Sequence, residues 1–202
     1  MVVNEVEEKG GERMKKIISR GNRPVNPSPA ALITSADEDG TPNIITLGEV
    51  FNISIYHPLI MGVAIRPATY SNSLIKKTGE FVINLTTVDI IEKVDLCGTV
   101  SGRNLFDKFK EFHLTPIPAD YVKPPLIEEC PVNIECKVID TQKVGDHDLF
   151  IGEVLAVHAD EDKIDEHGDI DFEKLDLLVY VTGSYRALGK KLENFRFTSA
   201  KK

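Results

Sequence analysis

Short apolar runs separated by turn residues fill the middle of this chain. Ala30–Ala36 (AALITSA) and Leu59–Ile65 (LIMGVAI) are the clearest runs, and each has the length of a strand rather than of a helix. Leu59–Ile65 is apolar throughout, so it predicts a strand buried on both faces. Asp37–Gly40 (DEDG) predicts a hairpin turn between the first run and a returning strand over Asn43–Val50, because Asp and Gly tolerate the positive φ of tight turns.

Helical spacing occurs at three places. Thr69 is a good N-cap for a helix that runs to about Thr78, where Gly79 stops it. Thr87 is expected to cap a second helix, and Lys108–Phe112 predicts a short third one. The apolar face of the second helix is formed by Ile90, Ile91, Val94 and Cys97.

The second half of the chain predicts strands again. The further strands are expected at Glu80–Leu85, Val132–Asp140, Leu149–His158 and Leu177–Tyr185. The last of them follows an acidic excursion over Asp160–Glu173 and is expected to close the sheet. Several strands joined by short turns, with few helices between them, predict a mainly β protein with a few α-helices, built as an antiparallel barrel. The chain lacks GxGxxG, which removes the usual reason to propose a doubly wound dinucleotide-binding fold.

Length and charge narrow the class of protein. The 202 residues suit one domain, expected over 14–202 after a flexible leader over 1–13. Hydrophobic residues make up 42% of the chain, and the net charge of −8 argues against nucleic acid or an anionic membrane as the main partner. No apolar window approaches the roughly 18 residues that would span a bilayer, so a cytoplasmic location is expected.

Several chemistries are disfavoured by spacing. The acidic run 160–165 lacks the glycine and the oxygen ligand that an EF-hand requires, and the five histidines never occur at metal-pair spacing. Ser101 lies in VSGR, which does not fit GxSxG. The three cysteines form no CxxC and are expected to be small buried residues. We therefore expect no metal site and no catalytic side chain.

A set of polar residues remains near the predicted strand ends. It comprises Thr46, Arg66, Thr69, Ser71, Asn84, Ser101, Arg103 and Lys108. Arg66 follows a buried strand and precedes the Thr69 cap. A helix N-terminus offers unpaired N–H groups to a phosphate, and an adjacent guanidinium can clamp it. The residues alone favour two interpretations equally: a phosphate site near Arg66–Ser73, or an ordinary capped helix beside a surface arginine.

The order of several segments resembles a known family. These segments are PAALITSADEDGTPNIIT (29–46), HPLIMGVAIRPATYSNSLIKKTGEFVIN (57–84), DLCGTVSGRNLFDKF (95–109), LTPIPADYVKPPLIEECPVNIECKV (114–138), GDHDLFIGEVLAVHADED (145–162) and GSYRALGKKL (183–192). Together they are similar to the flavoredoxin-like branch of the flavin reductase family, whose members bind FMN in a split β-barrel. The match covers almost all of 24–192.

The resemblance implies a cofactor site. It implies that Thr46, Leu47, Gly48 and Glu49 line the flavin, that Arg66, Thr69, Tyr70 and Ser71 hold the ribityl chain and phosphate, and that Asn84, Ser101, Gly102, Arg103 and Lys108 contact the ring or phosphate from the other side. It also implies a homodimer with each flavin near the subunit interface.

The resemblance also implies a redox function. The leading expectation is an NAD(P)H-dependent flavin reductase, with NADH and NADPH both open. The alternatives are an electron carrier of the flavoredoxin type, which accepts electrons from a redox protein, and a module that stores or senses flavin. Glu49 departs from the aromatic residue that is common in the family. A carboxylate there would disfavour a negatively charged acceptor and remove a stacking surface.

Overall fold

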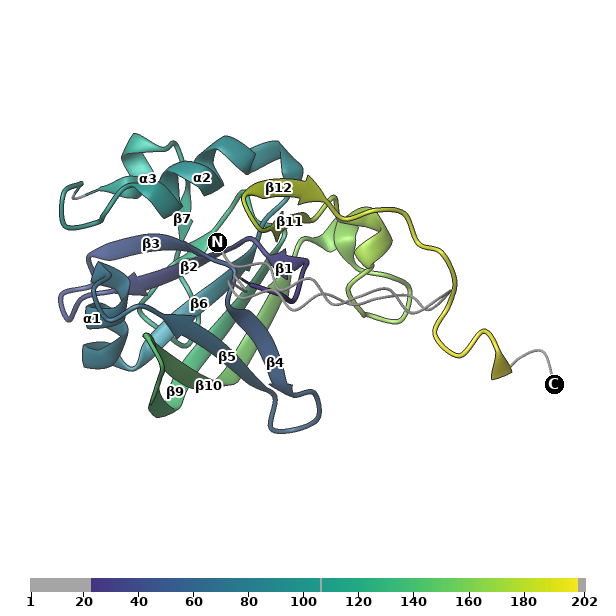
Figure 1. The fold of residues 1–202 in the computed structure, drawn as a ribbon, viewed down its shortest axis with the longest axis horizontal. Helices are drawn as coiled ribbons and strands as arrows, with labels where there is room; N and C mark the ends of the chain where they lie inside the picture. The colour runs from purple at the N-terminus through teal and green to yellow at the C-terminus, as the bar shows by residue number, and fades with distance from the viewer. Residues whose placement is uncertain (1–22, 106, 200–202) are drawn as a thin grey trace, which may run out of the picture.

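The computed structural model describes residues 23–105 and 107–199, so the expected leader over 1–13 lies outside the described residues. Its largest sheet has seven antiparallel strands in the order β3-β2-β6-β9-β10-β5-β4 (Figure 1). The strands are β2 Ala31–Ala36, β3 Pro42–Leu47, β4 Val50–Ser54, β5 Ile60–Ile65, β6 Glu80–Leu85, β9 Val132–Val144 and β10 His147–Ala159. The mainly antiparallel β class is therefore confirmed.

The predicted strand over Asn43–Val50 is wrong in one respect, because it is two strands. β3 ends at Leu47 and β4 begins at Val50, and the two occupy opposite edges of the sheet. The chain from Leu47 to Val50 can span at most roughly 11 Å. The two edges must therefore lie side by side, and the sheet curls into a barrel.

Two smaller sheets complete the β-structure of the residues that the structure describes. β1 (Ser28–Pro29), β11 (Leu178–Val181) and β12 (Ser184–Ala187) form a three-stranded sheet, and β7 (Pro116–Ile117) pairs with β8 (Leu126–Ile127). The expectation that Leu177–Tyr185 closes the main sheet is thus wrong. Gly183, at φ 83°, lets the chain reverse within this segment, so β11 pairs with β12 and β1 instead.

Three α-helices cover the barrel: α1 Tyr70–Thr78, α2 Ile91–Thr99 and α3 Lys108–Glu111. Short 3₁₀ turns lie at Val88–Ile90, Glu161–Lys163 and Phe172–Lys174. The predicted bounds of α1 are confirmed: the Thr69 hydroxyl accepts from Asn72 N at 3.3 Å, and Gly79 takes the left-handed conformation at φ 70°.

The predicted cap of the second helix is wrong. The side chain of Thr87 makes no capping hydrogen bond, because a 3₁₀ turn precedes α2. Ile90, Val94 and Cys97 are buried as expected, whereas Ile91 is 42% exposed. A 3₁₀ turn has three residues per turn, which places Ile91 away from the buried face.

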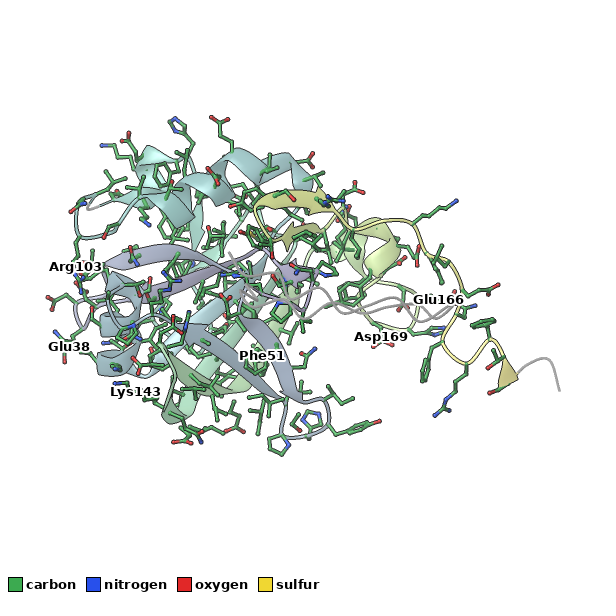
Figure 2. The ribbon with its side chains drawn as sticks, in the orientation of Figure 1. Glu38, Phe51, Arg103, Lys143, Glu166 and Asp169 are labelled. Carbon is green, nitrogen blue, oxygen red and sulfur yellow. The ribbon has the colours of Figure 1, made fainter. Side chains whose placement is uncertain are left out.

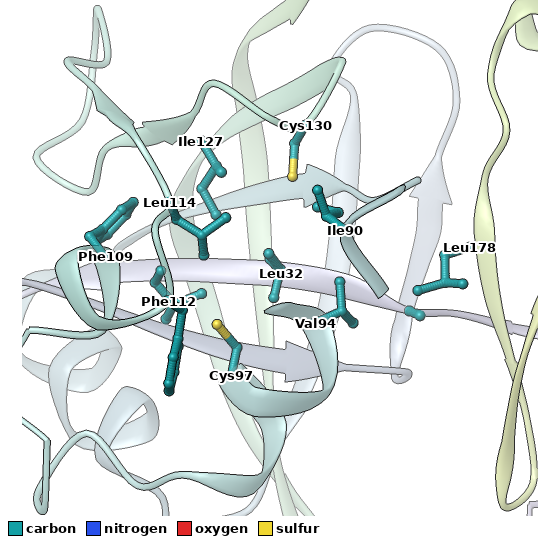
Figure 3. Close-up of a cluster of buried hydrophobic side chains, with 12 residues drawn as sticks. Leu32, Ile90, Val94, Cys97, Phe109, Phe112, Leu114, Ile127, Cys130 and Leu178 are labelled. Atoms are coloured by element: carbon teal, nitrogen blue, oxygen red, sulfur yellow. The ribbon is translucent and has the colours of Figure 1, made fainter. Parts of the chain in front are cut away.

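The two larger hydrophobic clusters of the described residues lie on the two faces of β2 and β3, and a small third one joins Val82, Val122 and Leu126. Ile33, Val63, Phe81 and Phe150 pack inside the barrel. Figure 3 shows the other cluster, in which Leu32 packs against side chains of α2 and α3 and the loops beside them. All three cysteines are buried and free, as expected. No helix in the described ranges is both long enough and apolar enough to cross a membrane.

Candidate functional site

The start of α1 carries an unneutralised positive end. β5 stops at Ile65, and the chain turns so that the backbone N–H and the hydroxyl of Thr69 both donate to Arg66 O, each at 3.0 Å. The first turn of α1 contains no acidic side chain. The buried Asp148 carboxylate, on β10, accepts from the Asn72 side chain at 2.9 Å and pairs with Lys76 at 2.7 Å. These contacts are to side chains, and the backbone N–H groups at the helix start favour an anion there.

Arg66 lies exposed beside this helix start. Among the described residues, its guanidinium forms no ion pair within 4.0 Å, although it interacts electrostatically with the carboxylate of Asp146. An arginine of this kind can clamp a phosphate with two hydrogen bonds.

A turn distant in sequence packs against the same helix start. Arg103 Nη1 donates to Ala68 O at 2.7 Å, and the guanidinium lies 5.9 Å from the ring centroid of Tyr70. Figure 2 shows Arg103 beside α1 and β3. Gly102 lies in close contact with Asn43 and Tyr70. A Cβ atom on Gly102 would lie 2.0 Å from Asn43 Oδ1 and 2.9 Å from Tyr70 Cδ1. The hydroxyl of Ser101 accepts from Arg103 N at 3.3 Å.

Asn43 joins this group, and sequence reasoning missed it as a site residue. Its Nδ2 donates to the buried hydroxyl of Ser71 at 2.7 Å. The sequence feature that could have identified Asn43 is its polar amide side chain near the start of a strand, shortly after a hairpin turn. We call the group the α1 cluster, defined by Asn43, Arg66, Thr69–Ser71 and Ser101–Arg103.

The other predicted lining residues lie at the far end of β3. The hydroxyl of Thr46 donates to Val94 O on α2, Leu47 is buried in the barrel, and Glu49 pairs with Arg23. β3 is an edge strand, so it leaves a row of backbone N–H and C=O groups without strand partners. The α1 cluster and Thr46–Glu49 thus lie at the two ends of one edge strand, β3, whose middle is contacted by Lys108 at Ile44 O.

Two of the predicted site residues, Asn84 and Lys108, are buried and already hydrogen-bonded, so their side chains are not available to a ligand at either end of β3. Asn84 is 0% exposed; its Nδ2 donates to Leu32 O at 2.9 Å, and its Oδ1 accepts from Asn133 Nδ2 at 2.8 Å. Lys108 is 3% exposed, and its ammonium donates to Ile44 O at 2.8 Å and to Cys97 O at 2.9 Å.

Both side chains therefore serve the fold. The Asn84 amide satisfies buried groups, and the Lys108 ammonium ties the edge of β3 to the C-terminal carbonyls of α2, where a cation is favourable. Burial lowers the pKa of Lys108, while the nearby Cys97 opposes that change. The sequence could not distinguish a lysine that binds ligand from one that binds backbone.

A separate cluster brings Asp120, Glu135 and His158 together, with ligand atoms within 4.8 Å of one another. The buried Glu135 carboxylate accepts from His158 Nε2 at 2.7 Å and from the backbone N–H groups of Asp120, Tyr121 and Val122. Those contacts already use both of its oxygens. The cluster thus fastens the 120–122 loop to β9 and β10.

The curled antiparallel sheet, with the start of α1 beside the edge strand β3, has the architecture of a split barrel. The chain belongs to the flavin reductase-like domain family, whose model matches residues 23–189.

Solved structures share the fold. Flavoredoxin of Desulfovibrio vulgaris (Miyazaki F) is 31% identical with a TM-score of 0.83, covering 93% of this chain and 100% of that one. Flavoredoxin from Methanosarcina acetivorans is 27% identical with a TM-score of 0.81, covering 95% and 99%. An FMN-binding protein from Thermus thermophilus, 24% identical with a TM-score of 0.74 over 90% and 99%, shows the same fold.

The donor chemistry of the α1 cluster fits the phosphate of FMN. It offers a helix N-terminus whose own first turn carries no acidic side chain, an arginine that forms no ion pair among the described residues and a second arginine fixed by Ala68 O. The edge of β3 offers further backbone groups for the remainder of such a molecule, apart from Ile44 O, which accepts from Lys108.

Proposed function

We propose that this protein binds FMN along the edge of β3, with the phosphate at the α1 cluster. The observation that carries the proposal is the convergence of Arg66 and the Ser101–Arg103 turn on a helix start whose first turn has no acidic residue. A helix N-terminus combined with arginine is a common anion site.

The length of the strand edge supports the same placement. Gly48 lies five positions after Asn43, which is roughly 16 Å along a strand. A phosphate bound beside the exposed Arg66, at the Asn43 end of β3, would therefore bring the ring toward Thr46–Glu49. Titration of the apoprotein with FMN and with riboflavin tests this placement. FMN should bind much more tightly than riboflavin, and equal affinities would show that the protein does not bind the phosphate.

The reaction we propose is the transfer of reducing equivalents from NADH or NADPH to bound FMN. When bound, FMN supplies the redox chemistry, and the protein binds, orients and electrostatically tunes it. A hydride step from nicotinamide needs close face-to-face positioning and no obligatory side-chain acid or base. The work left to this chain is to hold the phosphate at Arg66 and to keep the ring end at Thr46–Glu49.

A second candidate is an electron carrier that accepts electrons from a redox protein. The similarity to two flavoredoxins, at 31% and 27% identity, favours it. Anaerobic stopped-flow mixing of the FMN-loaded protein with NADH or NADPH separates the two. Rapid bleaching supports the reductase, whereas flavin that stays oxidised with both nucleotides supports the carrier.

We also propose a homodimer. Exposed apolar side chains gather on β4 and its loop and on the outer faces of β9 and β10; they are Phe51, Ile53, Ile55, Tyr56, Ile139, Leu155 and Val157. The C-terminal segment extends away from the barrel (Figure 1) and carries the exposed Leu192 and Phe195. Apolar surface of this extent is typical of a protein contact.

A further inference from the structure

Arg23 lies at the end of β3 that is opposite to the α1 cluster. Its Nη2 is 2.8 Å from Glu49 Oε1, and its guanidinium carbon is 5.0 Å from the ring centroid of Tyr180. A Cβ atom on Gly48 would lie 2.8 Å from Arg23 Nη1. The guanidinium therefore covers Gly48 directly.

Contacts from the small sheet hold this arginine in place. Asn26 Nδ2 donates to Arg23 O at 2.6 Å, and Asn26 Oδ1 accepts from Thr182 N at 3.1 Å. Tyr180 packs edge-on against Tyr185 at 5.8 Å, and the Tyr185 hydroxyl donates to Asp95 on α2 at 3.1 Å. Arg23 thus depends on β11, β12 and α2 for its position.

The ion pair between Arg23 and Glu49 is close to neutral overall. Glu49 alone would make the ring end negative, but Arg23 compensates it. The two side chains are 36% and 30% exposed, so the pair contributes little to folding stability. Lys108 is enclosed by backbone carbonyls, and Arg103 is bound at the other end of the strand. Of Arg23, Arg103 and Lys108, Arg23 is therefore the cation at the Thr46–Glu49 end of β3, where the flavin ring is proposed to bind.

We propose that Arg23, with its charge moderated by Glu49, raises the midpoint potential of FMN bound along β3. This inference rests on the proposed function. A hydride from the nicotinamide donor delivers two electrons and one proton, so NAD(P)H and FMN become NAD(P)⁺ and the anionic reduced flavin. The ring gains one negative charge, and a preorganised cation beside it stabilises that charge.

The test measures the midpoint potential of bound FMN by anaerobic spectroelectrochemistry in four proteins. Arg23→Gln should lower the reduced-to-oxidised ratio at a fixed potential about tenfold, which is about 30 mV for a two-electron couple. Glu49→Gln should raise it by a similar factor, because the arginine is then uncompensated. The double variant should return to within about threefold of the wild type, and Lys163→Gln, which removes a cation on the distant acidic excursion, should leave the ratio unchanged.

The outcomes separate this inference from the proposed function. A wild-type protein that binds no FMN contradicts the proposed function. A wild type that binds FMN, with both single variants at its potential, contradicts the role of Arg23 alone. Shifts of the same sign in both single variants would indicate a structural disturbance and also overturn the inference, while opposite shifts with unchanged thermal unfolding support it.

Discussion

Three arginines at the proposed site differ in the contacts that they already make. Arg66 has no ion-pair partner among the described residues, Arg103 is bound to Ala68 O and lies over Tyr70, and Arg23 is paired with Glu49. An arginine that is already paired gains less from a phosphate than one that is free. Arg66 is therefore the side chain whose removal should affect phosphate binding most.

Replacing Arg66 with Ala should weaken FMN binding about 10- to 100-fold, because a charge-assisted hydrogen bond is worth about 1.5–3 kcal/mol. Fluorescence titration of the apoprotein measures the affinity. Riboflavin, which lacks the phosphate, should bind both proteins alike, and Arg186→Ala on β12 serves as the control. An unchanged FMN affinity would refute the assignment.

Glu135 should make folding stability sensitive to acid. Burial alone would raise the pKa of its carboxyl, but hydrogen bonds from Asp120 N, His158, Tyr121 N and Val122 N together lower it. A folded-state pKa below the unfolded value of about 4.3 contributes stability above that pH, which is lost as the pH falls through the folded value.

Urea unfolding between pH 3 and pH 7 measures this effect. The free energy of unfolding of the wild type should fall as the pH drops below about 5. Glu135→Gln should lower it by about 1–3 kcal/mol at pH 7, since backbone donors lose a charged acceptor, and should flatten the decline. A variant with the full wild-type slope would assign that slope to other carboxylates.

At the scale of elements, the site depends on a turn that follows α2 and meets the start of α1. Gly102 is the point of contact, because any side chain there would collide with Asn43 and Tyr70. Lys108 supports the same arrangement by fixing β3 to the end of α2. These contacts fix the positions of the β3 edge, the start of α1 and the 101–103 turn relative to one another.

Gly102→Ala should displace that turn and weaken FMN binding about tenfold or more, because overpacking of this kind costs about 1–3 kcal/mol. Gly189→Ala is the matched control, since a Cβ atom there meets nothing within 4 Å. Equilibrium dialysis with FMN gives the affinities, and circular dichroism checks the fold. Equal affinities in the two variants would show that the turn does not touch the ligand.

At the scale of the whole molecule, the proposed dimer would cover apolar surface that one chain leaves exposed. Tyr56 is 80% exposed in the loop between β4 and β5, so its replacement should leave the barrel intact. Tyr121, 65% exposed between β7 and β8, offers a matched control.

Tyr56→Glu should weaken dimerisation at least about tenfold, since a buried unpaired carboxylate is strongly unfavourable in an interface. Sedimentation equilibrium measures it: the wild type should have twice the 22.4 kDa chain mass, and Tyr121→Glu should match it. A wild type that stays at the chain mass at all concentrations would exclude the dimer.

Local sequence patterns were enough to identify the family, the ends of α1 and several strands. Thr69 and Gly79 fix the ends of α1 through contacts within a few residues, so these ends can be read without the fold. Apolar runs locate several strands in the same way, but the break between β3 and β4 and the reversal between β11 and β12 appear only in the structure. The order of the segments likewise identified the flavin reductase-like family.

Which polar groups remain available to a ligand depends on long-range packing. Arg23 meets Glu49 across 26 positions of sequence, Arg103 reaches Ala68, and Lys108 is enclosed by carbonyls. Each outcome depends on the distance between segments that are remote in sequence. A cation binds a ligand only where folding has left it without a nearer acceptor, and that condition is absent from any local pattern.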